Sequence, residues 1–585
     1  MCFKRVGLRK KTKKFLGCDD DVYIFMLTTK GVFGKIDVLN RFGGVAGGLN
    51  TQIQKGGRSS RMAGTKANMK IFARMLALLL ACMTLLVLVV ACDNTSDPTG
   101  DQGGNGDSGL IDDAYDINGR LKDNLPADLN FEGEEIRILH WSDPENPEFE
   151  QETVTGDNVR DAIHDRNNQI EDRLNVELVW YGQPGDGGNI SSFVKHMENQ
   201  YNTSTKLYDI AIAYSRTLGL AAVHGYLYNF ATITENNYMD LSMPWWPQQL
   251  VDTVNFGDAY YFISGDMSTN VIYMMREMYF NKDLFNRYEL ENPYELVYNG
   301  KWTFDKMIEL TSDHYQDLDR NNTISDADMY GFVACDYVMS SFVPASNLRC
   351  VDDGVGDQDT LIISPDYGSA RMVKLLSKLG QWAATDSVRI HNGSVESIST
   401  RGNVTGAFGN GRSLMIVGHA SNAKGYSAKD FDLGIVPNPK YDEKQVNYYT
   451  GMGNPYSLYG IYVDFDAREG DEAKTLSMIT AVLECWASEG YRLTTPEVFE
   501  VNMQLKYSEG QDETNMFEYI RSGVTFDLGQ IFDAYLSTIS EKPIKQAVCI
   551  NASWSSAYAG LKVSIGAQLR QLCDNFRTYQ AERDK

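Results

Sequence analysis

From about residue 131 onward, the chain alternates short apolar runs with segments whose apolar residues recur at helical spacing. Runs typical of strands occupy residues 136–141, 176–181 and 208–214. Between the first two runs, Asp157 and Asn158 supply an N-cap for a helical pattern that includes Ile163 and Ile170, and a second helical pattern covers about 191–200. This β-α-β-α-β order predicts a mostly parallel sheet covered by helices.

The later part of the chain carries the same two kinds of pattern without an internal repeat. Strand-like segments occur at 259–264, 271–280, 414–417, 433–436 and 459–463. Helical patterns occur at 304–314, 370–384, 473–491, 516–520 and 531–540. The predicted fold class is α/β, with two lobes between which the chain crosses more than once.

The segment before the folded part is a signal-like sequence. Lys70 and Arg74 precede an apolar run at 75–91, which has the basic start and short apolar core of a secretory signal. The run ends in Val-Val-Ala-Cys at 89–92 and resembles the lipobox of bacterial lipoproteins. The resemblance implies a signal peptide at 69–91, cleavage before Cys92, and acyl chains such as palmitate on that cysteine. The alternative is an uncleaved helix that ends at an unrelated cysteine.

The regions on either side of this signal differ in character. Residues 93–109 contain no large apolar residue, so we predict a flexible tether over 92–130 between the lipidated cysteine and the fold. Residues 1–68 would place the signal in the interior of the sequence, whereas a secretory signal works at the N-terminus. We therefore interpret them as an over-extended start that is not part of the fold, with Met69 as the initiator. The alternative is a small basic cytoplasmic domain before a transmembrane anchor.

Charge separates the chain into the same parts. The formal net charge is −24, yet residues 1–68 hold 14 Lys and Arg against 4 Asp and Glu, so the part beyond Cys92 is strongly acidic. This acidity argues against nucleic-acid binding and against attachment to membranes through basic residues. Five cysteines follow Cys92, with no CxxC, which argues against a metal cluster. A disulfide such as Cys335–Cys350 remains open.

Four segments, in order, resemble extracellular solute-binding proteins of family 1, the maltose-binding type. They are YFNKDLF at 279–285, ENPYEL with GKWTFD at 291–305, FGNGRSLM at 408–415 and DLGIVPNP at 432–439. The resemblance implies a periplasmic-binding-protein-like (type II) fold with hinge crossings. By position, lobe 1 would comprise 131–266 and 433–490, and lobe 2 would comprise 267–432 and 491–585. Gly265 and Asp266 would form a hinge, because glycine absorbs backbone rotation during lobe closure.

The sharpest local motif is an EF-hand-like loop at 317–328. Side-chain oxygens fall at loop positions 1, 3, 5, 9 and 12, with a backbone carbonyl at position 7, which is the ligand spacing of a calcium loop. Position 6 is Asn322 rather than glycine, and position 12 is an aspartate rather than a glutamate. We predict a structural Ca²⁺ site, with a solvated acidic turn as the alternative. Its ligand residues would be Asp317, Asp319, Asn321, Thr323, Ser325 and Asp328.

Candidate ligand-binding residues follow from the rule that ligands of α/β sheets lie beyond the carboxyl ends of strands. Aromatic rings stack on sugar rings, and planar polar groups bind the hydroxyls. The candidates are His140, Trp141, Tyr214, Ser215, Trp245, Trp246, Asp266, His419, Tyr449, Asn454 and Trp554. For each tryptophan the alternative is core packing. For Asp266 it is the cap of a turn, and for His419 a buried histidine with satisfied hydrogen bonds.

Together these patterns predict a non-enzymatic, lipid-anchored solute-binding protein of an ABC importer on the extracellular or periplasmic face. The solute is expected to be a carbohydrate, and an oligosaccharide rather than a monosaccharide. The partners would be ABC permease subunits and, through the lipid, the membrane, with the protein itself a monomer. No HExxH, GxSxG or P-loop motif occurs. The alternatives are a surface-anchored glycoside hydrolase and a carbohydrate-binding scaffold without transport.

Overall fold

The computed structural model describes residues 114–257, 259–354, 357–391, 405–508 and 510–583. The predictions for residues 1–68, for the signal peptide at 69–91, for lipidation at Cys92 and for the tether up to residue 113 lie outside the described residues. None of the described helices combines the length and hydropathy of a membrane span.

The first lobe is built on a four-stranded sheet. Its strand order is β12 (Ser457–Ile461), β3 (Ile210–Tyr214), β1 (Glu134–Trp141) and β2 (Val176–Gln183). β1 pairs in parallel with both β2 and β3, whereas β12 runs antiparallel to β3. Every residue of β3 and β12 is buried, because helices cover both faces of a sheet built from β-α-β units.

Four helices pack on this sheet or on one another around it. They are α2 (Asn158–Leu174), α3 (Ile190–Thr203), α4 (Ser215–Val223) and α14 (Glu472–Glu489). At the start of α2, the Asp157 side chain accepts a hydrogen bond from the backbone N–H of Arg160, and α2 ends at Asn175, whose φ is 48°. The predicted β-α-β-α-β order of this part is therefore confirmed.

The second lobe is built on a five-stranded mixed sheet. Its strand order is β10 (Leu433–Pro437), β4 (Arg276–Asn281), β9 (Ser413–His419), β5 (Tyr330–Cys335) and β8 (Val388–His391). β5 pairs in parallel with β8 and β9, and β4 runs antiparallel to β9 and β10. Among the helices of this lobe are α9 (Phe304–Thr311), α11 (Ala370–Ala383) and α15 (Gln511–Ser522). The expected α/β fold with two lobes is confirmed by these two sheets.

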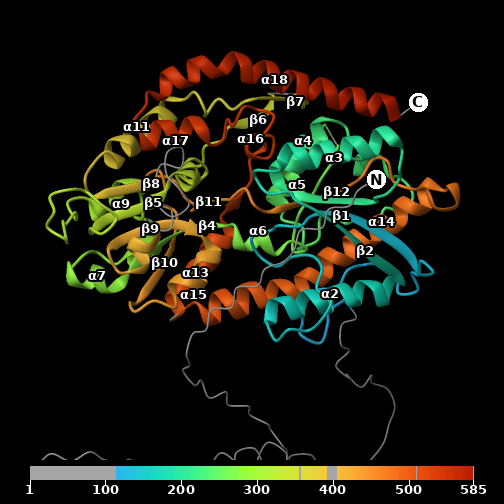
Figure 1. Ribbon diagram of the computed structural model, residues 1–585, viewed down its shortest axis with the longest axis horizontal. Helices are drawn as coiled ribbons and strands as arrows, with labels where there is room; N and C mark the ends of the chain where they lie inside the picture. Colours follow the sequence, from blue (N-terminus) through green and yellow to red (C-terminus); the bar gives the residue numbers. More distant parts are fainter. Residues whose placement is uncertain (1–113, 258, 355–356, 392–404, 509, 584–585) are drawn as a thin grey trace, which may run out of the picture. The chain divides into compact units, whose positions relative to one another are not determined.

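Further elements, one of them a helix of 30 residues, connect and cover the sheets. The helices are α5 (Gln248–Val254), α6 (Thr269–Tyr273), α7 (Lys282–Arg287), α8 (Pro293–Tyr298), α10 (Phe342–Ala345), α13 (Ala423–Tyr426), α16 (Leu528–Ile531), α17 (Lys542–Cys549) and α18 (Trp554–Arg583). Two small sheets pair β6 (Val351–Gly354) with β7 (Asp357–Ile363), and β11 (Thr450–Gly451) with β13 (Val524–Thr525). Figure 1 shows α18 running along both lobes, and it contacts α4 on one side and α11 on the other.

The lobe boundaries differ from those expected at two places. β10 belongs to the second sheet because it pairs antiparallel with β4, so the chain returns to the first lobe only after Pro437. The C-terminal part is not confined to the second lobe either, because α16 packs against α4 and α17 packs against α11. Three crossings result, at about 262–276, 438–456 and 495–511.

The segment at 114–130, expected to be part of the flexible tether, packs against the first lobe. Leu125 is buried, and the carboxylate of Asp123 accepts hydrogen bonds from Arg173 at 2.5 and 2.6 Å. Tyr115 and Leu121 form an antiparallel bridge. A buried apolar side chain and a buried ion pair give this segment the folding energy that the residues at 93–109 lack.

Three local predictions differ from the structure. The segment 259–264 forms only isolated bridges, and 271–280 divides into the one-turn helix α6 and strand β4. The helix expected at 531–540 is replaced by turns, because Ser537 and Thr538 adopt φ angles of 57° and 62°. The five described cysteines are free thiols, so Cys335 and Cys350 are not bridged.

Candidate functional site

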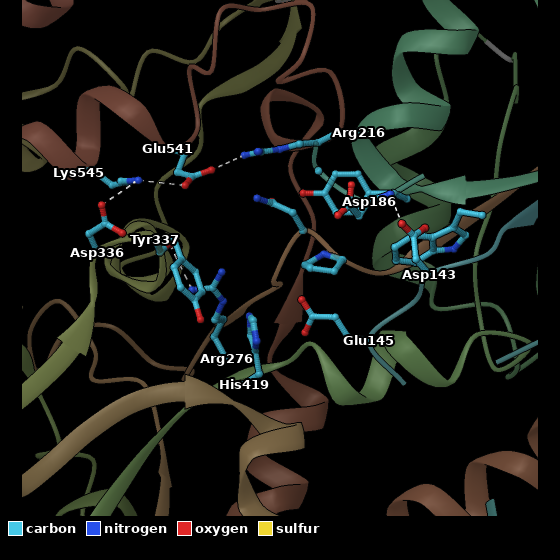
Figure 2. A pocket seen from close by; sticks show the side chains of 15 residues that line it. Asp143, Glu145, Asp186, Arg216, Arg276, Asp336, Tyr337, His419, Glu541 and Lys545 are labelled. Atoms are coloured by element: carbon cyan, nitrogen blue, oxygen red, sulfur yellow. Dashed lines mark hydrogen bonds and ion pairs between the residues drawn. The ribbon is translucent and has the colours of Figure 1, made fainter. Parts of the chain in front are cut away.

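A cavity of about 490 Å³ lies where the two sheets face each other, a size typical of small-molecule sites. Its first-lobe wall comes from the carboxyl ends of strands. Trp141 is the last residue of β1 and Tyr214 is the last residue of β3, while Asp143 follows β1 and Asp186 follows β2. Figure 2 shows Asp143 and Asp186 on the same side of the cavity.

The second-lobe wall follows the same rule. Asp336 and Tyr337 directly follow β5, and His419 is the last residue of β9. Arg276 is the first residue of β4, and the antiparallel register places it opposite His419. The start of an antiparallel strand lies at the same sheet edge as the carboxyl ends of its neighbours, so both residues reach the cavity.

Ion pairs connect the two walls through the C-terminal part of the chain. Arg216, in the first turn of α4, lies 2.8 Å from Asp533 and 2.6 Å from Glu541. Lys545 on α17 lies 3.0 Å from Asp336 and 3.4 Å from Glu541. Glu541 therefore pairs with a cation from the first lobe and with a cation on a helix that packs against the second (Figure 2).

Burial and ion pairing shift the pKa values of these carboxylates in opposite directions. Burial would raise the pKa of Glu541, but Arg216 and Lys545 outweigh it and hold the pKa below its ordinary value. Burial of Asp533 outweighs the attraction of Arg216, so the pKa of Asp533 lies above its ordinary value. A raised pKa marks a carboxylate whose charge is costly in this wall.

Three aromatic residues line the cavity. Trp141 is 1% exposed, and its indole N–H donates to the Ser457 hydroxyl at 2.9 Å. The Tyr214 ring lies 5.8 Å from it at a tilted angle, and burial raises the pKa of Tyr214 to about 12. Tyr337 is half-buried and is the most accessible of the three rings. Trp141 and Tyr214 are therefore almost fully covered, and Tyr337 offers the larger contact surface.

Four of the sequence-based candidates line the cavity, namely Trp141, Tyr214, His419 and Asn454. Ser215 lies behind the wall, where its hydroxyl donates to the carbonyl oxygen of Asn454 at 2.7 Å. His419 is 6% exposed; burial and the charge of Arg276 lower its pKa well below the ordinary value, so it is neutral.

The structure places three of the candidate tryptophans in the core rather than at the cavity. Trp245 and Trp246 are fully buried, and each indole N–H donates to an oxygen of Glu484 at 3.1 Å. Trp554 donates to the carbonyl oxygen of Tyr367 at 3.0 Å. Burial raises the pKa of Glu484 to about 8, although the two indole donors oppose this effect.

Three further candidates also lie away from the lining. The His140 ring faces the opposite side of β1 from Trp141, and its Nδ1 lies 2.9 Å from the Trp141 carbonyl oxygen. Asp266 lies 3.8 Å from Arg521, and burial raises its pKa to about 6. Tyr449 is half-buried and is not among the lining residues. At the expected hinge, a Cβ on Gly265 would lie 2.2 Å from the Trp245 carbonyl oxygen, so close packing requires glycine there.

Sequence reasoning missed most of the charged lining. Three of the missed residues, Asp143, Glu145 and Asp186, lie in the loops that follow predicted strands. The carboxyl-end rule would have included them if it had been applied further along each loop than the residues next to the strand end. Asp336 and Tyr337 directly follow β5, so the same extended rule would include them. No local pattern marks Glu541 or Lys545, which reach the cavity through the packing of α17.

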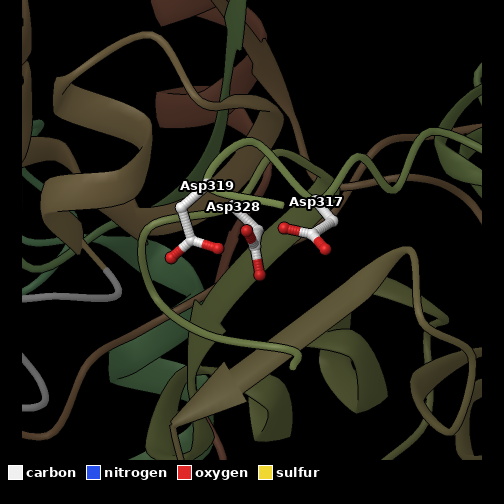
Figure 3. A group of neighbouring side chains, drawn as sticks. All are labelled: Asp317, Asp319 and Asp328. Atoms are coloured by element: carbon white, nitrogen blue, oxygen red, sulfur yellow. The ribbon is translucent and has the colours of Figure 1, made fainter. Parts of the chain in front are cut away.

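The predicted calcium loop is a compact turn outside this cavity. Oxygens of Asp317, Asp319 and Asp328 lie within 4.8 Å of one another. Figure 3 shows these three side chains as neighbours in the loop. Asn322 has a φ of 59°, the left-handed conformation expected at position 6. Gln316 and Met329 pair across the base of the loop.

Hydrogen bonds within the loop orient its carboxylates. Asp317 accepts from the backbone N–H groups of Asn321 and Asn322, and these bonds lower its pKa. Asp328 is fully buried and accepts from Ser325 and from the Tyr315 hydroxyl. Three convergent carboxylates fit a hard divalent cation, whose oxygen ligands lie about 2.3–2.6 Å away.

The fold and the cavity define a two-lobed α/β protein with a polar site between its lobes. The sequence matches no family model and no curated protein. Similar solved structures include the maltose-binding periplasmic protein of Listeria monocytogenes in complex with maltose, with 12% identity over 76% of this chain and 98% of that chain and a TM-score of 0.46.

Two further similar structures are also described as sugar-binding proteins. The cyclic α-maltosyl-1,6-maltose binding protein of Arthrobacter globiformis has 14% identity, coverage of 75% and 99%, and a TM-score of 0.48. The maltose/maltodextrin-binding domain of Bdellovibrio bacteriovorus bound to maltotriose has 11% identity, coverage of 74% and 100%, and a TM-score of 0.45. At these values the function has to be argued from the residues of this chain.

Proposed function

We propose that the protein is an extracellular solute-binding protein that captures a carbohydrate between its two lobes. The observation that carries the proposal is the cavity of about 490 Å³, whose walls come from the strand ends of both sheets. Its lining combines aromatic rings with many hydrogen-bonding groups, which is the chemistry that a sugar requires. An oligosaccharide is favoured because the cavity is larger than a single sugar ring needs.

Binding would work through lobe closure. A solute that contacts Tyr214 and Asp143 on one lobe and Tyr337 on the other gains its full set of contacts only when the lobes are together. Such a ligand shifts the population toward the closed form by its differential affinity. No bond is made or broken in this step.

The test is calorimetric titration of the full-length chain with neutral and acidic oligosaccharides, together with thermal unfolding. A ligand at 100 times its Kd should stabilise the protein by about 2.7 kcal/mol. Stabilisation by peptides or polyamines but by no sugar would refute the carbohydrate assignment.

The cellular role extends this proposal. We infer that Cys92 carries the lipid that holds the protein at the outer face of the membrane, where it would deliver its solute to ABC permease subunits as a monomer. Support comes from the lipobox-like sequence and from the acidic, tether-like residues that follow it. Metabolic labelling with a palmitate analogue tests this: a Cys92→Ala variant should lose the label, and retained label would exclude this lipidation site.

A glycoside hydrolase is the second candidate, because five carboxylates line the cavity. Asp336 and Glu541 are ion-paired, and Asp143 and Asp186 are held by backbone N–H groups, so a binding role is favoured. Overnight incubation with a bound oligosaccharide separates the two functions. Release of shorter products that is abolished by Asp186→Asn would favour the hydrolase.

We also propose a structural Ca²⁺ at the loop of residues 317–328. Asp317, Asp319 and Asp328 would hold the ion with their carboxylates, and Asn321, Thr323 and Ser325 complete the expected ligand set. The ion would neutralise the mutual repulsion of three close carboxylates and fix the entry into β5, which leads to Asp336 in the cavity wall.

A further inference from the structure

The three cations that line the cavity differ in their pairing. Arg216 has two carboxylate partners, Asp533 and Glu541, and Lys545 also has two, Asp336 and Glu541. Arg276 has no carboxylate within 4.0 Å among the described residues. Of the cavity's described cations, it is the one left without an ion pair.

Arg276 is also deeply buried. The residue is 2% exposed, and its guanidinium lies 5.4 Å from the centre of the Tyr337 ring. One terminal nitrogen donates to the Tyr337 carbonyl oxygen at 3.3 Å, while Nε has no hydrogen-bond partner. Burial lowers the pKa of Arg276, and Glu541 and Glu145 act on it only from a distance. The guanidinium therefore keeps donor capacity that the described residues do not use.

The neighbour of Arg276 in the sheet does not compensate this charge. His419 lies opposite Arg276 in the β4–β9 register and is neutral because burial and the guanidinium lower its pKa. Its Nε2 is buried and has no hydrogen-bond partner among the described residues. Figure 2 shows both side chains rising from the second sheet toward the cavity. A buried cation beside a neutral histidine is an unfavourable arrangement unless something else supplies an anion.

Two of the five carboxylates that line the cavity are held away from Arg276 by backbone hydrogen bonds. Asp143 accepts from the Gly185 N–H at 2.8 Å, and Asp186 accepts from the Gly188 N–H at 2.9 Å. Both lie on the first-lobe side, across the cavity from Arg276 (Figure 2). Across the cavity from Arg276, Asp143 and Asp186 thus offer carboxylate oxygens that can accept hydrogen bonds from hydroxyl groups.

We propose that the solute is an acidic carbohydrate, a sugar bearing a carboxylate, whose carboxylate binds the Arg276 guanidinium while its hydroxyls donate to Asp143 and Asp186. The planar fork of a guanidinium matches a carboxylate and binds it with charge-assisted hydrogen bonds. This inference rests on the proposed function, because it specifies the sugar class taken by the same cavity.

The experiment compares ligands that differ only in charge. Calorimetric titrations of the full-length chain use trimers of galacturonate, guluronate, mannuronate and glucuronate, the methyl ester of each, and maltotriose. We expect one of the uronate trimers to bind at least tenfold more tightly than its ester. The difference should shrink as salt is raised from 50 to 500 mM, because salt screens the ion pair.

Variants test whether Arg276 causes the preference for the acid over the ester. Arg276→Gln should lose most of the preference for acid over ester, and Arg276→Lys should keep part of it, because a lysine retains the charge but not the fork. Arg287→Gln is the matched control: it removes one positive charge from an exposed position in α7, and should leave the preference unchanged.

The outcomes separate this inference from the proposed function. If maltotriose or an ester binds as tightly as every uronate, the solute is neutral; the acidic-sugar inference then fails while the carbohydrate function stands. If no sugar binds, both fail. Equal loss of acid and ester binding in a folded Arg276→Gln protein would also overturn the role of Arg276. Should that variant not fold, the acid-to-ester comparison on the unmodified protein still decides.

Discussion

Asp123→Ala tests whether the segment before β1 is an integral part of the fold. The Asp123 carboxylate is fully buried. It accepts two hydrogen bonds from Arg173 on α2 and one from the Ser488 hydroxyl on α14 at 2.8 Å, and Arg492 lies 3.8 Å away. One side chain thus ties the N-terminal segment to two helices of the first lobe. Its removal leaves Arg173 without its closest partner.

The expected loss in the free energy of unfolding depends on how far Arg173 is buried. Breaking a buried ion pair from one side costs about 3–5 kcal/mol, because the remaining charge is left unpaired. Arg173 is 30% exposed, so water can solvate part of its guanidinium. We therefore expect a loss of about 2–3 kcal/mol in the free energy of unfolding, which is less than that range because water solvates part of the remaining charge.

The assay is urea unfolding at pH 7, followed by tryptophan fluorescence. Asp128→Ala is the matched control, because Asp128 lies in the same segment but is exposed, and its loss should stay within about 0.5 kcal/mol. If Asp123→Ala and Asp128→Ala change stability equally little, the segment at 114–130 behaves as a tether and the reasoning is refuted.

The pH dependence gives an independent check. Burial would raise the pKa of Asp123, but the hydrogen bonds and charge of Arg173 outweigh burial, so the pKa lies below its ordinary 3.8. The carboxylate therefore stabilises the fold fully above pH 3.8, and this contribution is lost as pH falls through the lowered pKa. The difference in stability between the parent and Asp123→Asn should shrink over that acidic range, and a constant difference would contradict the assignment.

Three further predictions concern the ligand, the metal and the core. Tyr337→Ala should raise the Kd for the bound sugar five- to tenfold by calorimetry, because it removes the most accessible ring; an unchanged Kd would show that the ring does not contact the solute. A chelator should lower the Tm of the parent but not of Asp317→Ala, and equal Tm values with and without chelator in the parent would argue against Ca²⁺. Gly331→Ala should lower the free energy of unfolding, measured in urea, by about 1–3 kcal/mol, because the new Cβ would lie 1.8 Å from the Thr311 carbonyl oxygen. Gly425→Ala in α13 is the control: its Cβ would meet nothing within 4 Å, so this variant should not be destabilised.

The predictable part of this molecule is the part that local patterns specify. The strands and helices between Glu134 and Tyr214 follow from apolar periodicity and from the Asp157 cap, because β-α-β units bury each element against its sequence neighbours. The carboxyl-end rule located Trp141, Tyr214 and His419 at the cavity for the same reason.

The remainder depends on contacts that no local pattern contains. Trp245 and Trp246 look like sugar platforms in the sequence, and only their distant partner Glu484 reveals them as core residues. Arg276 was missed because it begins an antiparallel strand, which the carboxyl-end rule for parallel strands does not cover. Glu541 reaches the cavity only because α17 packs against the second lobe.

The ion pair of Glu541 with Arg216 also raises the question of what holds the two lobes together around the cavity. Its pair with Arg216 joins the first lobe to a segment packed on the second, so separation of the lobes along this wall would break it. Arg216 is 12% exposed and Glu541 19%, and in an open form water would hydrate both groups. Because opening would return both charges to water, the desolvation penalty of the closed pair offsets much of its coulombic attraction, and its net contribution to closure is small. A contact of that size cannot hold the lobes together by itself, so under the proposed function the solute's own contacts would supply the larger difference that selects the closed form.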